Sequence, residues 1–131
     1  MTEYAFLAQL TEADPLSLSD IALGVSRDGS FTPKLVFGTD QAAVAYFEVY
    51  GRTASPDAVT VRLEIAETPD GRALSTAVPR VVNQGADRRI VIGALPIAAL
   101  APGDYVVRAI VSVDSRPVGR ITRTLRKSTS G

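Results

Sequence analysis

Short runs of alternating hydrophobic and polar residues, separated by turn-forming residues, cover most of the chain. The clearest run spans residues 59–65. Its odd-numbered positions are aliphatic and would face a core, whereas Thr60, Arg62 and Glu64 at the even positions would face water. A period of two residues is typical of a strand with one buried face, so this run predicts a half-buried β-strand.

Residues 43–50 form the most aromatic run of the sequence. Its odd-numbered residues share one face of the predicted strand, and Tyr46, Glu48 and Tyr50 share the other. Two tyrosines on one side of a strand could form a small platform, so these three residues are the candidate interaction surface. Packing of the two rings at a sheet edge is the simpler alternative.

Other β-rich runs follow, with a turn after about every 8–12 residues. They span residues 17–24, 31–37, 74–82, 89–92, 105–113 and 118–126. Pro33 restricts its run to a sheet edge or a connection, because proline cannot donate a backbone hydrogen bond. The sequence Pro69-Asp70-Gly71-Arg72 predicts a hairpin turn, in which Gly71 is able to take a positive φ.

The last third of the chain contains a crossover signal followed by a tyrosine. A proline-flanked segment, too short for a helix, would carry Ile97 and Leu100 over the open end of the core. Pro102 and Gly103 suit a type II turn. Tyr105 then begins a strand, which fits a tyrosine corner whose hydroxyl bonds a backbone group of the preceding crossover. A core tyrosine with its hydroxyl at the rim fits the sequence equally well.

Seven to eight short strands at this spacing predict an all-β fold, an immunoglobulin- or fibronectin-III-like antiparallel β-sandwich. Helix-period segments between the strands are missing, which disfavours a parallel α/β sheet. The sandwich is expected over residues 16–127, between an N-terminal extension or linker at 1–15 and a disordered tail at 128–131. Residues 4–10 have helix-like spacing and would pack back on the domain or dock on a neighbour. The polar end from Lys127 onward should be loose.

Composition limits the chemistry that the chain can perform. Its 131 residues correspond to one domain, and it contains neither cysteine nor histidine. This excludes disulfides, Cys/His zinc sites, thiol nucleophiles and His-based catalytic triads. No apolar run reaches the roughly 18 residues of a membrane-spanning helix, so membrane insertion is not expected. The N-terminus does not have the pattern of a secretory signal, which would make the protein cytoplasmic if Met1 is its native start.

Charged residues are distributed unevenly along the chain. Residues 1–70 carry eleven acidic and four basic side chains, whereas residues 71–131 carry three and ten. The simplest interpretation is that strands from the two halves lie side by side and attract each other. Head-to-tail stacking of copies through a bipolar surface is the alternative.

The last predicted strand is rich in arginine, which would suit a nucleic acid. However, no aromatic residues are interleaved with the arginines, and Arg123 falls between two aliphatic positions on the apolar side. A buried arginine needs a carboxylate partner. We therefore expect no nucleic-acid binding, and we expect Arg123 or Arg108 to pair with a carboxylate such as Glu48.

No arrangement of residues predicts catalysis, a metal site or a cofactor. The sequence has no G-x-S-x-G elbow, no calcium-loop spacing of acidic residues and no glycine-rich phosphate loop. Asp20, Glu48, Glu64 and Asp104 lie on or beside predicted strands, where each is expected to be solvated or paired with arginine. We therefore expect a protein that is not an enzyme and that holds no cofactor or metal.

Four segments give the chain a likeness to a known kind of domain: residues 18–23 (LSDIAL), 46–50 (YFEVY), 100–105 (LAPGDY) and 118–124 (VGRITRT). Over about residues 16–127 the chain resembles the C-terminal sandwich domains of large bacterial envelope or secreted proteins. These carry a von Willebrand factor A-like domain of the acidobacterial type, or a GWxTD domain. The resemblance implies a non-catalytic accessory domain outside the cytoplasm, with Met1 at the start of a fragment. The D-x-S-x-S adhesion motif of the A-like domain is absent, so adhesion by that route is not implied.

These patterns together predict a non-catalytic structural or protein-interaction module, whose rigid core presents strand edges and loops. Its partner would be another protein or another copy of the chain. A β-sandwich that binds glycans or other ligands is the alternative, and it would use Tyr46 and Tyr50 as its platform.

Overall fold

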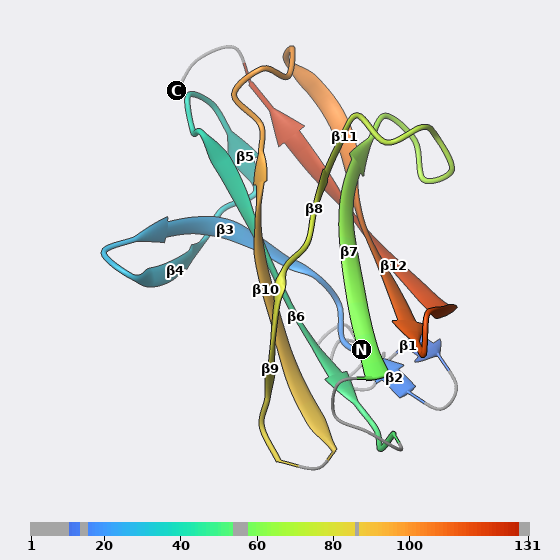
Figure 1. Cartoon of the computed structure of the whole chain (residues 1–131). Helices are drawn as coiled ribbons and strands as arrows, with labels where there is room; N and C mark the ends of the chain where they lie inside the picture. Colours follow the sequence, from blue (N-terminus) through green and yellow to red (C-terminus); the bar gives the residue numbers. More distant parts are fainter. Residues whose placement is uncertain (1–10, 14–15, 54–57, 86, 129–131) are drawn as a thin grey trace, which may run out of the picture.

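The computed structural model describes residues 11–13, 16–53, 58–85 and 87–128 of the chain. These residues form two β-sheets that pack face to face, and no α-helix occurs among them (Figure 1). The predicted all-β sandwich is therefore confirmed. Residues 4–10, with their helix-like spacing, lie outside the described residues.

Seven strands form the first sheet, which we call sheet A. They are β1 (Thr11–Ala13), β2 (Leu16–Leu18), β3 (Ala22–Arg27), β4 (Ser30–Pro33), β6 (Ala42–Tyr50), β9 (Arg80–Asn83) and β10 (Arg88–Pro96). The strand order is β1-β2-β6-β10-β9, and β3 also pairs with β6 while carrying β4 on its other side. The β3–β4 hairpin, which turns at Asp28 and Gly29 with positive φ, projects from the body of the sandwich (Figure 1).

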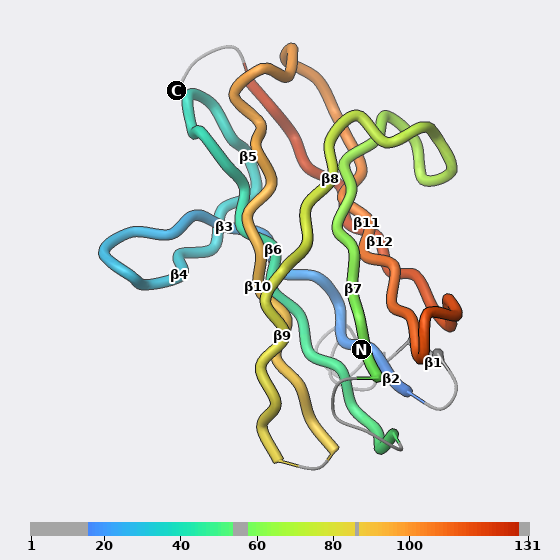
Figure 2. The backbone as a smooth tube through the Cα atoms, in the orientation of Figure 1, coloured from blue at the N-terminus to red at the C-terminus, as the bar shows by residue number. Residues whose placement is uncertain are grey.

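Five strands form the second sheet, which we call sheet B. They are β5 (Val36–Phe37), β7 (Val59–Ala66), β8 (Ser75–Ala77), β11 (Gly103–Val113) and β12 (Arg116–Lys127). The order is β5-β12-β11-β7-β8, and all neighbours are antiparallel except β5 and β12. The chain passes between the sheets five times, after β4, β5, β6, β8 and β10 (Figure 2).

The described residues contain more strands than the seven to eight predicted, because several edge elements are only two to four residues long. The predicted run at 17–24 divides into β2 and β3, which both pair with β6. The run at 74–82 divides at Val78 and Pro79, and its two parts enter different sheets. Strand β1 lies within the segment expected as an N-terminal extension and pairs with β2.

The core lies between the inner faces of the two sheets. On β6, Phe47 and Val49 point inward and are fully buried, as the alternation predicts. Ile97 is also fully buried and Leu100 packs partly on the core, so the predicted crossover covers the end of the sandwich. The predicted inner face of β11 is buried as well: Tyr105, Val107, Ala109, Val111 and Val113.

Tyr105 forms the contact expected of a tyrosine corner. Its hydroxyl donates a hydrogen bond to the carbonyl oxygen of Ala101, at 2.5 Å, in the preceding crossover. Gly103 has φ of 152°, a conformation that favours glycine, but this value lies far from the roughly 80° of a type II turn. Gly103 instead begins β11, directly after Pro102.

Two local expectations need correction. A turn at Pro69 and Asp70 joins the antiparallel strands β7 and β8 as predicted, and the Gly71 amide donates to the Thr68 carbonyl oxygen at 3.1 Å. However, the connection is an eight-residue loop over residues 67–74, and Gly71 does not have a positive φ. The end from Lys127 onward is not loose as far as it is described. Lys127 is buried, and its ammonium donates to the carbonyl oxygens of Ile97 and Ala98, while the Ser128 amide donates to Phe37. Burial of the aliphatic stem explains why a lysine can end the last strand.

Candidate functional site

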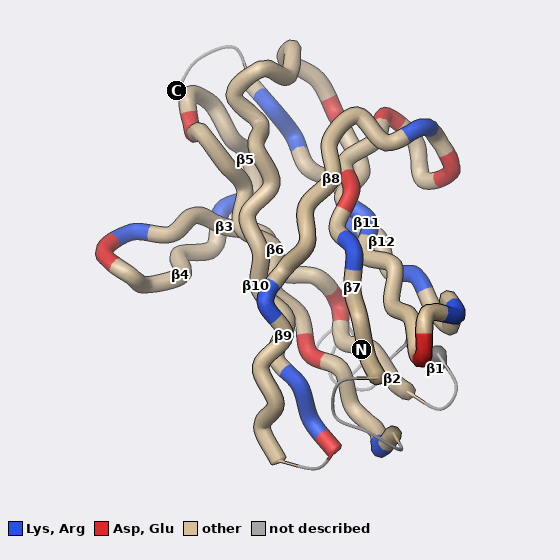
Figure 3. The backbone as a smooth tube through the Cα atoms, viewed as in Figure 1, with Lys and Arg blue, Asp and Glu red and all other residues tan. Residues whose placement is uncertain are grey.

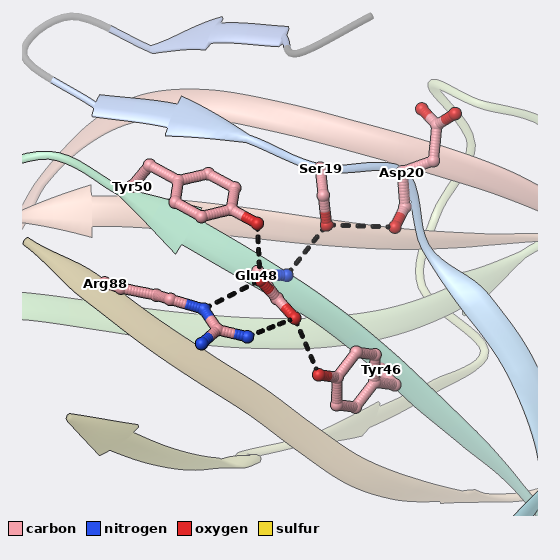
Figure 4. A network of polar contacts seen from close by, with 6 residues as sticks. All are labelled: Ser19, Asp20, Tyr46, Glu48, Tyr50 and Arg88. Atoms are coloured by element: carbon pink, nitrogen blue, oxygen red, sulfur yellow. Dashed lines mark hydrogen bonds and ion pairs between the residues drawn. The ribbon is translucent and has the colours of Figure 1, made fainter. Parts of the chain in front are cut away.

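Three predicted site residues and one further arginine meet on the outer face of sheet A. Tyr46, Glu48 and Tyr50 alternate with buried residues along β6, so their side chains project away from the core. Arg88, at the start of β10, lies opposite Tyr50 in the strand register. Figure 4 shows the two tyrosines and the arginine converging on the Glu48 carboxylate.

The Glu48 carboxylate accepts four hydrogen bonds. Arg88 binds both of its oxygens, with Nε to Oε1 at 3.0 Å and Nη2 to Oε2 at 2.9 Å. The Tyr46 hydroxyl donates to Oε2 at 2.8 Å, and the Tyr50 hydroxyl donates to Oε1. An ionised carboxylate offers about four acceptor positions, so this network uses its full capacity. The result is a fixed array of two phenol rings and one guanidinium group.

The network shifts the ionisation of its members. Hydrogen bonds from Arg88 and then Tyr50 lower the pKa of Glu48 to about 2, against an ordinary 4.5, although burial opposes the shift. The hydrogen bond to Glu48, followed by burial, raises the pKa of Tyr50. Burial and then the hydrogen bond to Glu48 raise the pKa of Tyr46. At neutral pH the site therefore holds one carboxylate, one guanidinium and two neutral phenols.

A local break in the sheet fixes the backbone beneath Glu48. Between β2 and β3, Ser19 donates its amide to the Glu48 carbonyl at 2.9 Å. Its hydroxyl oxygen accepts the Glu48 amide at 2.8 Å and donates to the Asp20 carbonyl at 3.2 Å (Figure 4). The Ser19 side chain thus replaces a ladder hydrogen bond where the chain bends between β2 and β3, so that Ile21 can enter the core.

Half-buried apolar side chains surround this network. Ile90 lies opposite Glu48, and Ile92 lies opposite Tyr46. From the β3–β4 hairpin, the Phe31 ring contacts the Tyr46 ring with a centroid separation of 6.0 Å. We call the surface formed by these residues the tyrosine face: Phe31, Tyr46, Glu48, Tyr50, Arg88, Ile90 and Ile92.

Arg108 pairs with a carboxylate, as predicted, but that carboxylate is Glu64 rather than Glu48. Arg123 donates to the carbonyl oxygen of Ile21 at 3.0 Å. Arg88, the true partner of Glu48, was not singled out in the sequence. Its signal would have been a positive charge diagonal to Glu48 on the outer face of the neighbouring strand, which can be recognised only once the pairing of β6 with β10 is known.

Glu64 lies on the outer side of sheet B and is paired with arginine, as predicted, but it is buried rather than facing water. Arg108 donates a hydrogen bond to its carboxylate, and Arg62 forms an ion pair with it. In the described part of the chain, three of the six ion pairs join an acid of the first half to an arginine of the second: Glu48–Arg88, Glu64–Arg108 and Asp70–Arg120. Figure 3 shows acidic and basic segments interspersed over both sheets, as the side-by-side interpretation expects.

Two outward-facing arginines of β12 pair with carboxylates of the same chain. Arg120 binds Asp70 at 2.8 Å, and Arg126 binds Asp104 at 2.9 Å. Hydrogen bonding by Arg126 lowers the pKa of Asp104. Arg120 and Arg126 are therefore bound by carboxylates of their own domain on the outer side of sheet B.

Other groups do not assemble into a second chemical site. The described residues hold no group of three acidic, cysteine or histidine side chains placed to bind a metal ion. A hollow of about 440 Å³ at the crossover end includes Asp40 and Lys127. Asp40, however, is bound by Lys34 at 2.8 Å, and this hydrogen bond lowers its pKa. No helix in the described part is long and apolar enough to cross a membrane.

Comparison with known proteins adds no relative to this description. No protein-family model matches the chain, and no curated protein matches it. The chemistry of the tyrosine face therefore carries the functional argument.

Proposed function

We propose that this protein is a non-catalytic interaction module that binds another protein through the tyrosine face. The observation that carries this proposal is the saturated network around Glu48, which holds Tyr46, Tyr50 and Arg88 in one geometry on an open sheet face. Tyrosine and arginine are the residue types most often found at the energetic centre of protein interfaces. Side chains that are already ordered lose little entropy when a partner binds.

The same network supports a binding role rather than catalysis. A general base needs a lone pair that can reach a substrate proton. The four donors around Glu48 occupy its carboxylate, and its pKa of about 2 makes it a weak base. The two phenols have raised pKa values and donate their protons inward, which disfavours a tyrosinate nucleophile.

The fold supports an accessory role of the immunoglobulin- or fibronectin-III-like kind. The chain passes between the two sheets five times, and the Tyr105 hydroxyl donates a hydrogen bond to the crossover that precedes it. Together with the sequence resemblance, this motivates the proposal that the domain belongs to an envelope or secreted bacterial protein and acts outside the cytoplasm.

Affinity capture with matched variants tests the proposal. The immobilised full chain, Tyr50→Ala and Tyr46→Ala would be compared as baits in an extract of the source cells. Thr122→Ala, on the outer face of sheet B, is the control. We expect a protein bound by the wild type and the control to be lost from both tyrosine variants, and to bind the wild type directly once purified. Equal capture by all four baits would contradict the proposal.

A glycan array with the same proteins tests the alternative function. Two tyrosine rings beside hydrogen-bonding groups also form a surface suited to a sugar. Glycan binding that disappears in Tyr46→Ala and Tyr50→Ala, but persists in Thr122→Ala, would favour the glycan-binding sandwich over the protein-binding module.

A further inference from the structure

Building on the proposed function, we infer that the tyrosine face binds the same face of a second copy of this chain, related by a two-fold axis. In such an interface each group meets its counterparts on an identical surface, so the patch must complement itself. The charge, the hydrogen-bonding groups and the size of the tyrosine face determine whether it can complement itself.

The charge of the tyrosine face suits an identical face. Glu48 and Arg88 neutralise each other at its centre, and the whole chain has a formal net charge of zero. A strongly acidic or basic partner would find no opposing field on this surface. A second copy would meet neither long-range repulsion nor an unpaired charge.

The hydrogen-bonding groups of the face also complement each other. Tyr46 and Tyr50 both donate their hydroxyl protons to Glu48, so toward a partner each oxygen can only accept. Arg88 uses Nε and Nη2 on Glu48, and Figure 4 shows its third nitrogen, Nη1, pointing away from the carboxylate. The face thus presents donors and acceptors together, as a two-fold contact requires.

Its size predicts a weak dimer. Strands β6 and β10 have nine residues each, which corresponds to a length of about 30 Å. With two flanking strands the face is roughly 15–20 Å wide, giving roughly 500–600 Å² per copy against about 800 Å² in a standard interface. Ile90 and Ile92 supply its apolar contact area.

The β9 edge of sheet A offers a poorer route to self-association. Strand β9 has only four residues, follows Pro79 and begins with the exposed Arg80. Short length, proline and charge are the features that keep edge strands from pairing with other chains. This favours the face over the edge as the contact between copies.

Sedimentation equilibrium of the full chain over a hundredfold range of concentration tests the inference. We expect the average mass to rise from 13.8 kDa toward twice that value. Ile92→Lys, on the half-buried outer face, should remain monomeric because it places a charge beside Arg80 and inside the contact. Val78→Lys is the matched control, since Val78 is 85% exposed and off the face, and it should associate like the wild type.

Backbone amide chemical shifts locate the contact independently. On dilution, shift changes should concentrate in β6 and β10 of the wild type and disappear in Ile92→Lys, whose circular dichroism would confirm folding. A wild type that stays monomeric, or a dimer that Ile92→Lys does not weaken, would overturn the inference. If the wild type is monomeric but Ile92→Lys abolishes binding of a purified partner protein, the self-association is refuted and the proposed function stands.

Discussion

Arg108 on β11 lies directly opposite Glu64 on β7, and its Nε donates to Glu64 Oε1 at 2.5 Å. Both residues are on the outer face of sheet B, yet both side chains are less than one tenth exposed. The loop after β7 accounts for this burial. The carbonyl oxygen of Pro69, in that loop, accepts a hydrogen bond from Arg108 Nη1 at 2.8 Å and one from Arg120. The loop after β7 thus buries an ion pair that would otherwise lie on the surface of sheet B.

Glu64→Gln should lower the free energy of unfolding by about 2–4 kcal/mol, because it leaves the buried Arg108 guanidinium without its counter-charge. Urea denaturation at neutral pH measures this. Arg62→Gln is the matched control, since it removes the second cation bound to Glu64 from a side chain that is 61% exposed. It should cost less than about 1 kcal/mol. Equal effects of the two substitutions would contradict the proposed burial of the pair.

Alternation along the chain was sufficient to predict most of the fold. It assigned β6, β7 and β11 to strands and identified their inner faces, because burial of one face imposes a period of two. The burial of Glu64 could not be predicted in this way, because the loop that covers it lies outside its strand. The alternation of residues 59–65 contains no information about that loop.

The candidate site was predicted only in part. The alternation placed Tyr46, Glu48 and Tyr50 on one face, and their contacts follow from that placement. Arg88 is separated from Glu48 by 40 residues and reaches it through the pairing of β6 with β10. Which strands pair, and in which register, depends on the packing of the whole sandwich, so sequence spacing could not reveal this contact.

Acid should remove the stabilisation provided by Glu48. Its pKa is lower in the folded protein than in the unfolded chain, so its contribution is complete above pH 4.5 and is lost as the pH falls toward 2. The wild type should lose up to about 3 kcal/mol more than Glu48→Gln over this interval. Urea denaturation at several pH values between 7 and about 2 measures the difference. Parallel pH dependences for the two proteins would refute the role of the network.

Ionisation of the two tyrosines at high pH is a second test of the network around Glu48. The pKa values of Tyr46 and Tyr50 are raised in the folded protein, so their contribution to stability persists below pH 10 and is lost as the pH rises above it. Phenolate absorbance at 295 nm should therefore show two tyrosines ionising late in the wild type. In Glu48→Gln the titration of both should shift toward lower pH, since the neighbouring negative charge is gone. An unchanged titration would mean that Glu48 does not govern the phenols.

Tyr105→Phe should remove one hydrogen bond without opening a cavity. The ring would keep its buried position, but the carbonyl oxygen of Ala101 would lose its donor. We expect a loss of about 1 kcal/mol in the free energy of unfolding, measured by urea denaturation. Tyr105→Leu is the comparison, and it should cost more because it also removes aromatic packing. If Phe cost as much as Leu, the hydroxyl contact would have no separate role.

Gly24→Ala should displace the β3–β4 hairpin, and with it Phe31, from the other residues of the tyrosine face. A Cβ atom at residue 24 would lie 2.2 Å from the Thr32 carbonyl oxygen and 2.8 Å from the Phe31 ring, and the nearer obstacle is backbone that cannot rotate away. We expect a loss of about 2–4 kcal/mol by urea denaturation, together with altered amide chemical shifts around Tyr46, whose ring Phe31 contacts. Gly29→Asn is the control, because residue 29 has φ of 79° and open space around its Cβ position. Asparagine tolerates that conformation, so the control should change stability little and leave the Tyr46 signals in place. A Gly24→Ala protein with wild-type stability would contradict the prediction that close packing at residue 24 holds the hairpin in place.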